Sequence, residues 1–393
     1  MVGASSNFPL YAGGDVRVLE LSRNLANLGL DVHILVAGKV SRKKDLESLI
    51  LHELDLRPGV LYFPTLPKQL KAARSIVREE GIEIVHGHML WGGLLSLAIK
   101  SITNVPNVFD PHDWFFSHFY GIPLALDVPE RILAMMSDVT LLTGQTLKSY
   151  VIMKGVKMRK LFCVPNGVRE EFLSFRPSKQ LIARAEELVG GASFRIIFVG
   201  ALLWYMGLDV LIRAFSMFLD RKYCSEAALV IVGSGPERDR LKSLAKKLGI
   251  VDNVIFTGSL KLEMLISMLD IADVAVIPFV KNLYTSFIQP IKLLEYMARS
   301  KPVVASNLPG VAEIVNHGVD GLLVRPGDPV ALADALALLA QDEEFRAKLG
   351  RHGREVVERN YTWRASAKKL KAIYEIVLER ELGGRVGRVH RLQ

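Results

Sequence analysis

Short runs of β-branched and apolar residues alternate with helical runs along nearly the whole chain, and this alternation most constrains the fold. The N-terminal series contains DVHILVA, IEIVHGH, VPNVFD and DVTLLTG. The C-terminal series contains FRIIFVG, ALVIVGSG, NVIFTGS, VAVIPF and KPVVAS. Strands separated by helices pair in parallel, because a parallel neighbour needs a crossover connection. The sequence therefore predicts an α/β protein with two doubly wound parallel sheets.

The chain has 393 residues, which exceeds the length of about 250–300 residues at which single cores stop growing. We expect an N-terminal domain over residues 1–170, a connector over 171–192 and a C-terminal domain over 193–361. A helix over 362–381 and a basic tail over 382–393 complete the chain. Only MVG precedes the first loop, so we expect a shortened first strand and a true start upstream of Met1.

Composition excludes several classes of protein. Half of the residues are apolar and 23% are charged, which is typical of a globular chain. The net charge of +9 suits an anionic partner, but there is no zinc-finger or aromatic RNA-binding motif, so we expect no nucleic-acid partner. The longest uncharged apolar run, residues 89–99, is shorter than the about 20 residues that span a bilayer. Two cysteines and no basic leader segment predict a cytoplasmic protein.

Two basic segments in the N-terminal half offer contact with an anionic surface. One is a stripe at helical spacing, formed by Lys68, Lys71, Arg74 and Arg78. The other is a loop with Lys39, Arg42, Lys43 and Lys44. The ordinary interpretation is a solvated face, and we favour it because long charged side chains usually stay exposed. The alternative is contact with anionic headgroups, which would place the protein at the inner face of the cell membrane.

Glycines follow several of the predicted strands, at the edge where ligands bind in open parallel sheets. Gly13 and Gly14 precede a helix, whose N-terminus would attract phosphate, although a plain tight turn explains two glycines equally well. Gly233 and Gly235 follow the strand ALVIV, but Arg238 stands where a dinucleotide fingerprint needs a third glycine. This pattern argues against NAD or FAD and allows close approach to a nucleotide base or ribose.

Histidines lie at the ends of two predicted strands. His86 and His88 alternate along one strand, and His112 with Asp113 follows the next. A zinc site is conceivable, but no nearby Cys or Glu completes a known spacing, so we expect no metal. Buried, hydrogen-bonded rings are the favoured interpretation for His86 and His88. We predict a functional role for His112, because it begins the loop after a strand.

The stretch that begins QPIKLLEYMA carries the strongest signal for a binding site. Pro290 suits the first turn of a helix, and Lys292 and Glu295, three residues apart, share a helix face. A carboxylate near a helix start can accept hydrogen bonds from ribose hydroxyls. The alternative is a surface ion pair worth about 0.3 kcal/mol.

Several segments together resemble the retaining glycosyltransferases of family 4, which have the GT-B fold. The similar segments occur in the family's order: AGGDVRVLELSRNLANLG, the VPNGV that contains Asn166, Gly167 and Val168, IIFVGALLWYMGLDVLIRAF, VIVGSGPERDRLKSLAKKLGI, LLEYMARSKPVVAS and GVAEIVNHGVDGLLVRPGD. The resemblance implies two Rossmann-like domains facing a cleft, and a last helix, YTWRASAKKLKAIYEIVLER, that returns to the first domain.

The resemblance also implies transfer of a sugar from a nucleotide-sugar to a glycan or lipid-linked acceptor, with retained anomeric configuration and without metal or cofactor. By position, Glu295 would bind the ribose, Gly14 would approach the phosphates and His112 would lie near the sugar or acceptor. Gly233 and Gly235 would lie near the base.

The loop after Gly200 departs from the family pattern. The family's diphosphate clamp is an Arg and a Lys, and the matching positions here are Ala201 and Met206; a further family carboxylate is replaced by Phe287. Each lost charge-assisted bond is worth about 1.5–3 kcal/mol of donor binding. Two alternatives follow: Lys292 or Lys281 supplies the charge, or the chain is a degenerate GT-B protein that binds a ligand or partner without turnover. The residues from Leu202 to Met206 either line the binding site or pack in the core.

Overall fold

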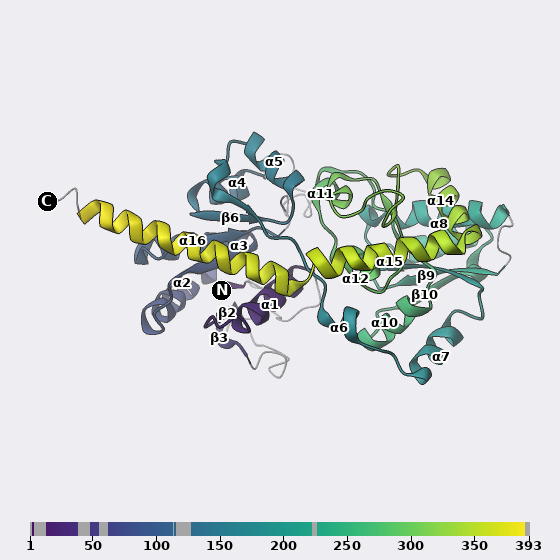
Figure 1. The fold of residues 1–393 in the computed structure, drawn as a ribbon, viewed down its shortest axis with the longest axis horizontal. Coiled ribbons are helices and arrows are strands. Elements are labelled where there is room, and N and C mark those ends of the chain that lie inside the picture. Colours follow the sequence, from purple (N-terminus) through teal and green to yellow (C-terminus); the bar gives the residue numbers. More distant parts are fainter. Residues whose placement is uncertain are drawn as a thin grey trace. The chain divides into compact units, whose positions relative to one another are not determined.

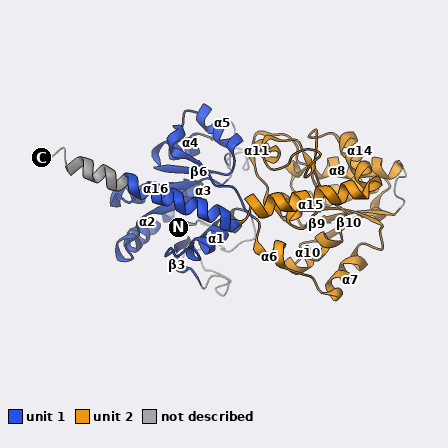
Figure 2. Cartoon of the chain, in the orientation of Figure 1, with its two compact units in different colours: residues 1–167, 363–393 blue, residues 168–362 orange. Residues whose placement is uncertain are grey.

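A computed structural model of the chain describes residues 2–3, 13–37, 48–54, 62–112, 114, 127–221 and 226–389. The basic loop over residues 39–44, Asp113 and Cys224 lie outside these residues. The structure divides into two compact units, unit 1 with residues 1–167 and 363–393, and unit 2 with residues 168–362 (Figure 2). Each unit is an α/β domain built on a parallel sheet, as the sequence predicts.

Unit 1 contains a seven-stranded sheet in the order β3-β2-β1-β4-β5-β6-β7, and the pairs in it are parallel. Its strands are β1 (Val2–Gly3), β2 (His33–Ala37), β3 (Ile50–Leu54), β4 (Val85–His88), β5 (Asn107–Asp110), β6 (Val139–Leu142) and β7 (Leu161–Cys163). The strand order reverses beside β1, and right-handed crossovers then place helices on both faces of the sheet.

The helices of unit 1 connect these strands (Figure 1). They are α1 (Gly13–Ala26), α2 (Tyr62–Glu79), α3 (Met89–Thr103), α4 (Asp127–Met136), α5 (Gln145–Met153), the short 3-10 helix η3 (Met158–Lys160) and α16 (Trp363–Val389). The helix α16 extends past residue 381, where the sequence pattern places its end. Lys68, Lys71, Arg74 and Arg78 all lie exposed on α2.

Unit 2 contains a six-stranded parallel sheet in the order β10-β9-β8-β11-β12-β13. Its strands are β8 (Phe194–Val199), β9 (Ala227–Val232), β10 (Val254–Gly258), β11 (Val274–Ile277), β12 (Val303–Ser306) and β13 (Leu322–Val324). Central strands such as β9 and β11 are buried along their whole length, which explains their continuous apolar sequences.

The helices of unit 2 cover this sheet, and side chains of the sequence mark several of their ends. Asp328 accepts hydrogen bonds from two backbone N–H groups at the start of α14, where Pro329 takes the first helical position. The helices are α6 (Glu170–Ser174), α7 (Lys179–Leu188), η4 (Trp204–Met206), α8 (Leu208–Asp220), α9 (Arg238–Lys247), η5 (Val251–Asn253), α10 (Leu262–Ile271), α11 (Leu283–Phe287), α12 (Ile291–Ala298), α13 (Pro309–Ala312), α14 (Pro329–Gln341) and α15 (Glu343–Asn360).

The two places where the chain passes between the units lie next to each other. The N–H of Val168 donates to the carbonyl of Tyr361 at 2.8 Å, and Val168 forms a parallel bridge with Thr362. Beyond this point α16 belongs to unit 1, where Ser366 Oγ donates to the carbonyl of Pro165 at 2.8 Å.

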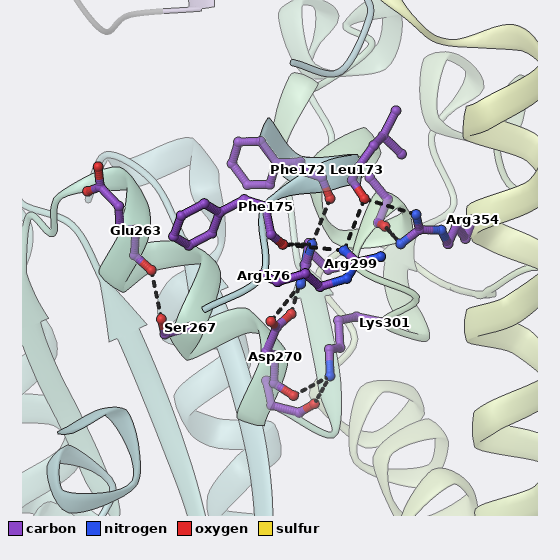
Figure 3. A network of polar contacts seen from close by, with 12 residues as sticks. Phe172, Leu173, Phe175, Arg176, Glu263, Ser267, Asp270, Arg299, Lys301 and Arg354 are labelled. Carbon is purple, nitrogen blue, oxygen red and sulfur yellow. Dashed lines mark hydrogen bonds and ion pairs between the residues drawn. The ribbon is translucent and has the colours of Figure 1, made fainter. Parts of the chain in front are cut away.

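A polar network centred on Arg299 holds the segment after Arg169 against the rest of unit 2 (Figure 3). Arg299 forms a two-point ion pair with Asp270, with N–O distances of 2.7 and 2.6 Å. Its remaining nitrogen donates to the carbonyls of Phe172 and Phe175, both at 3.1 Å. These bonds satisfy carbonyls at the end of α6 that have no helical partner.

Among the helices that the structure describes, none is both long enough and apolar enough to cross a lipid bilayer.

Candidate functional site

Three histidines and one aspartate gather at the carboxyl ends of β4 and β5 in unit 1. His86 and His88 point to the same side of β4, and their rings stack with centroids 4.1 Å apart. His88 Nδ1 lies 2.8 Å from His112 Nε2, and His86 Nδ1 lies 2.6 Å from the hydroxyl of Tyr374 on α16. All three histidines are buried, which agrees with the interpretation of His86 and His88 as buried, hydrogen-bonded rings.

His112 has a left-handed backbone conformation, with φ of +60°. This region is uncommon for a non-glycine residue and costs free energy unless the surroundings hold it. Here the N–H of His112 donates to Asp110 Oδ1 at 3.2 Å, so the carboxylate at the end of β5 fixes the turn. His112 Nδ1 is buried and has no hydrogen-bond partner among the residues that the structure describes. The Nε2 atoms of His86 and His88 are also buried without a partner among these residues. What distinguishes His112 is its place at the start of the loop after β5, where a polar ligand can reach it, so it stays the functional candidate of this group.

Arg17 on α1 supplies the positive charge of this site. Its guanidinium is fully buried and donates to Asp110 Oδ2 at 2.9 Å. It also donates to the side chain of Asn166 and to the carbonyl of Val164, both at 3.0 Å. The helix α1 begins at Gly13 and Gly14, so these two glycines precede the residue that ties α1 to the sheet.

Burial and charge set the protonation of this cluster. Burial lowers the pKa of His86 and of His88 well below the usual value, and it lowers the pKa of His112 to about 4. The rings are therefore neutral at pH 7. Burial alone would raise the pKa of Asp110, but the charge and hydrogen bond of Arg17, together with the neighbouring His112 and His88, keep this pKa below the usual value.

His86, His88 and Asp110 form the one group among the described residues whose ligand atoms lie close enough, within 4.8 Å of one another, to hold a metal ion. The surroundings disfavour this use, because Arg17 already binds Asp110 and its positive charge would repel a second cation. Hydrogen bonds to Tyr374 and His112 also engage one nitrogen of each histidine ring. We keep the prediction that the reaction uses no metal.

In unit 2, glycines line the carboxyl ends of β8 and β9. A Cβ on Gly233 would lie 2.0 Å from the carbonyl oxygen of Gly200, and a Cβ on Gly235 would lie 2.5 Å from that of Leu202. Any side chain at either position would separate the two loops. Close packing of backbone on backbone therefore explains both glycines, and a role near the nucleotide base stays a prediction.

The loop from Gly200 to Gly207 packs closely against its neighbours, and most of its apolar side chains lie in the core of unit 2. Leu202, Tyr205 and Met206 are buried, whereas Trp204 is 62% exposed. Gly207 has φ of +69°, and a Cβ there would lie 1.8 Å from the carbonyl oxygen of Pro278. The sequence left open whether these side chains line a site or form core; the structure has three of them in the core and Trp204 at the surface.

Lys292 points toward this loop from the first turn of α12. Its ammonium lies 3.6 Å from the sulfur of Met206 and 4.6 Å above the ring of Phe198. A Cβ on Gly200 would lie 2.1 Å from the same ammonium, so the charge reaches the glycine that ends β8. Desolvation by these side chains lowers the pKa of Lys292 to about 8, while the charge of Glu295 opposes the shift. At pH 7 the side chain is mostly protonated.

Glu295 pairs with Arg169, a residue that the sequence analysis did not single out. Arg169 Nη2 lies 3.4 Å from Glu295 Oε1, and both side chains are mostly buried. Burial raises the pKa of Glu295, and the charges of Arg169 and Lys292 oppose this shift. Glu295 thus forms an ion pair with Arg169, although Lys292 shares its helix face. The position of Arg169 directly after VPNGV was the available signal.

The remaining candidates take simpler positions. Lys281 is exposed, and Phe287, at the position of the second family carboxylate, is partly buried. Asp110 ends a predicted strand and was detectable on that ground. Arg17 and Tyr374 were not, because nothing local indicates that a helix arginine and a tyrosine 288 residues away meet His86 and its neighbours.

Two family models match the chain. One, described as Glycosyltransferase Family 4, matches residues 11–172, and the other, described as glycosyl transferases group 1, matches residues 180–356. The chain belongs to the family 4-type glycosyltransferases with the GT-B fold. The resemblance noted in the sequence and the predicted pair of Rossmann-like domains are thereby confirmed.

Curated relatives and solved structures carry glycosyltransferase names over most of this chain. An uncharacterized glycosyltransferase of Methanocaldococcus jannaschii is 28% identical over 80% of each chain. A D-inositol 3-phosphate glycosyltransferase of Kribbella flavida is 29% identical over 94% of this chain and 92% of that one. The Anabaena protein HepE, solved with UDP and glucose, matches with a TM-score of 0.78 at 16% identity, covering 95% of this chain and 98% of that chain. At 16% identity, this match shows only that the two chains share a fold.

Proposed function

We propose that this glycosyltransferase transfers a sugar from a nucleotide-sugar donor to a glycan or lipid-linked acceptor, with retained anomeric configuration. The observation that carries the proposal is the placement of Lys292, whose ammonium reaches Gly200 and forms no ion pair with a carboxylate of the described residues. A cation held among Phe198, Phe279 and Met206 is costly unless an anion uses it. A donor diphosphate at the end of β8 is such an anion.

In this proposal the other residues have distinct tasks. Glu295 accepts hydrogen bonds from the ribose, and Arg169 orients its carboxylate from the far side. His112 uses its unpartnered Nδ1 to hold the transferred sugar or the acceptor. Gly14 and the N-terminus of α1 bind phosphate oxygens through backbone N–H groups. The Anabaena neighbour was solved with UDP and glucose, which supports a nucleotide-sugar as the donor class.

The test begins with binding. A screen of UDP-, GDP- and ADP-sugars for thermal stabilisation identifies the donor, because a ligand of the native state raises the melting temperature. Lys292→Met removes the charge and keeps the length of the side chain. Lys281→Met tests the other lysine that the sequence offers for this charge, which is exposed in the structure. We expect Lys292→Met to weaken donor binding by at least tenfold, since a charge-assisted bond contributes about 1.5–3 kcal/mol, and Lys281→Met to leave it unchanged.

The second part of the test is turnover. With the donor found, NMR of the product reports whether the anomeric configuration is retained. Equal donor affinity in wild type and Lys292→Met would refute the role of Lys292. Donor binding without transfer to any glycan or lipid-linked acceptor would instead favour a binding protein that has lost its transferase activity.

A further inference from the structure

Exposed hydrophobic side chains gather at one edge of unit 1, outside the candidate site. Met153 is 78% exposed, Met158 is 64% exposed and Met136 is 55% exposed. Ile132 and Met135 follow at 47% and 42%. Contiguous exposed apolar surface on a folded protein usually marks a contact site. We call these five side chains the methionine surface.

The three segments that carry the methionine surface touch one another. Met135 and Met136 end α4, Met153 ends α5, and Met158 begins η3 (Figure 1). A Cβ on Gly155, between α5 and η3, would lie 3.5 Å from the terminal methyl of Met135. Lys160, which ends η3, donates from Nζ to the carbonyl oxygen of Met135 at 2.6 Å. The exposed methionines therefore form one surface and are not scattered singly.

Positive charge surrounds this surface. Residues 143–161 contain Lys148, Lys154, Lys157, Arg159 and Lys160 and no Asp or Glu. Lys157 and Arg159 are exposed on either side of Met158. The preceding carboxylate in the sequence, Asp138, is paired with Lys100. Burial lowers the pKa of Lys160; the neighbouring cations lower it further, and Asp138 opposes them.

The methionine surface and His112 lie at opposite ends of the strands of the sheet. The helix α4 ends immediately before β6, α5 runs back from the carboxyl end of β6, and η3 directly precedes β7. All three therefore place their exposed side chains at the amino ends of the strands, whereas the histidine cluster lies at the carboxyl ends. This surface is independent of the donor site and of the proposed transfer reaction.

We propose that the methionine surface docks unit 1 onto an anionic lipid bilayer. The methionines and Ile132 enter the headgroup region, while Lys154, Lys157 and Arg159 contact lipid phosphates. Apolar side chains ringed by Lys and Arg are what an interfacial segment needs. The basic stripe of α2 lacks the apolar part, because none of the described side chains of α2 is an exposed large hydrophobic. A second copy is a poor occupant, since its identical cations would repel.

The experiment is cosedimentation of the full chain with vesicles of phosphatidylglycerol and phosphatidylcholine, with pure phosphatidylcholine vesicles in parallel. We expect binding to the anionic vesicles that weakens as salt rises, because exposed charges are screened. Met153→Ser with Met158→Ser is expected to weaken binding at least tenfold. Lys154→Gln with Lys157→Gln and Arg159→Gln is expected to weaken it roughly 100-fold, since each cation near such a surface contributes about a factor of five.

Two control variants locate the contact. Val251→Ser with Val319→Ser removes exposed apolar side chains of unit 2, which are 49% and 52% exposed, and should leave vesicle binding unchanged. Replacing Lys68, Lys71, Arg74 and Arg78 by Gln tests the α2 stripe and should reduce binding far less than the methionine-surface variants. Because the substituted positions are exposed, or partly exposed at Lys154, melting temperatures should stay close to wild type.

Several results overturn the proposal. One is equal vesicle binding by wild type and the Met153→Ser, Met158→Ser variant. Another is loss of vesicle binding when only the four basic residues of the α2 stripe are replaced. A third is a dimer in light scattering that this same double variant dissociates, since the surface would then be a protein interface. Transfer to a water-soluble acceptor should be unchanged in the methionine-surface variants, so failure of this proposal is distinguishable from failure of the proposed function.

Discussion

The ammonium of Lys292 lies 3.6 Å from the sulfur of Met206, so a cation from α12 lies beside the side chain that we predict to occupy the position of the family's clamp lysine. The two residues are 86 positions apart in the chain. One positive charge therefore lies near the end of β8, although neither predicted clamp position, Ala201 or Met206, carries one. Substitutions that move the positive charge between positions 292 and 206 can therefore test which position binds the donor diphosphate.

Moving the charge should reveal the coupling of these two positions. Met206→Lys alone places a second ammonium against Lys292 at a buried position, so we expect the free energy of unfolding to fall by several kcal/mol. Adding Lys292→Met to this variant should recover most of the loss, with a coupling energy of about 1–3 kcal/mol in a double-mutant cycle. Urea unfolding of the four proteins measures it. Additive effects would show that the two side chains do not interact.

Ala201, the first of the two predicted clamp positions, should tolerate a charged side chain. Ala201 is exposed, so Ala201→Arg is expected to change the free energy of unfolding by less than about 0.5 kcal/mol. If the loop aligns with the family's clamp, this variant tightens binding of a nucleoside diphosphate, measured by calorimetry. A folded variant with unchanged affinity would refute that alignment.

Glu295 should contact the donor nucleotide. We expect Glu295→Ala to weaken nucleotide binding and to raise its dissociation constant by about tenfold or more, because two hydrogen bonds to a charged group are lost. Arg169→Met should have a smaller effect of the same sign, since Arg169 holds the carboxylate at 3.4 Å and does not itself bind the ribose in our proposal. Calorimetric titration measures both. If the affinity of folded Glu295→Ala equals that of wild type, the ribose role is wrong.

Acid should destabilise unit 1 through its neutral histidines. The pKa of His112 is lowered to about 4, so the native state keeps this ring neutral while the unfolded state, with a pKa near 6.5, takes up a proton. Stability is therefore complete above pH 6.5 and is lost as pH falls toward 4, by about 3 kcal/mol for His112 alone. His86 and His88 act in the same direction.

The variant His112→Asn isolates this contribution. Asn adopts the left-handed conformation more readily than most residues and does not titrate in this range. Urea unfolding at pH 7 and pH 5 should show a loss on acidification that is smaller than in wild type by about 2 kcal/mol. An identical loss in both proteins would mean that His112 does not stay neutral in the folded state.

Replacing the buried Arg299 should lower the free energy of unfolding more than most substitutions in unit 2. Arg299→Met leaves Asp270 without its partner and frees the carbonyls of Phe172 and Phe175, so we expect a loss of about 3–5 kcal/mol. Arg359→Met is the matched control, because its ion pair with Glu355 is exposed and worth less than about 1 kcal/mol. Thermal unfolding of the two variants compares them. Equal shifts would show that the network in Figure 3 does not hold α6.

Local sequence determined the type and order of the elements. The alternation of apolar and helical runs predicts parallel strands because it is itself the consequence of strands buried on both faces, and a run such as ALVIV carries that signal without reference to any other part of the chain. The turns at Gly200, Gly207 and Gly233 could also be predicted from local sequence. Each glycine is required by its own backbone, and a glycine after a strand indicates a tight turn wherever the turn is later packed.

Only the tertiary structure decided which side chains meet. His86 contacts Tyr374 across 288 residues, Glu295 pairs with Arg169 across 126, and Arg17 reaches Asp110 across 93. These contacts depend on the strand order and on where α1, α12 and α16 pack, and a periodic pattern contains no record of either. The same limit applies to the apolar loop ALLWYM. Its hydrophobicity alone does not tell a buried Met206 from an exposed Trp204, because burial is a property of the neighbours that the fold brings to each side chain.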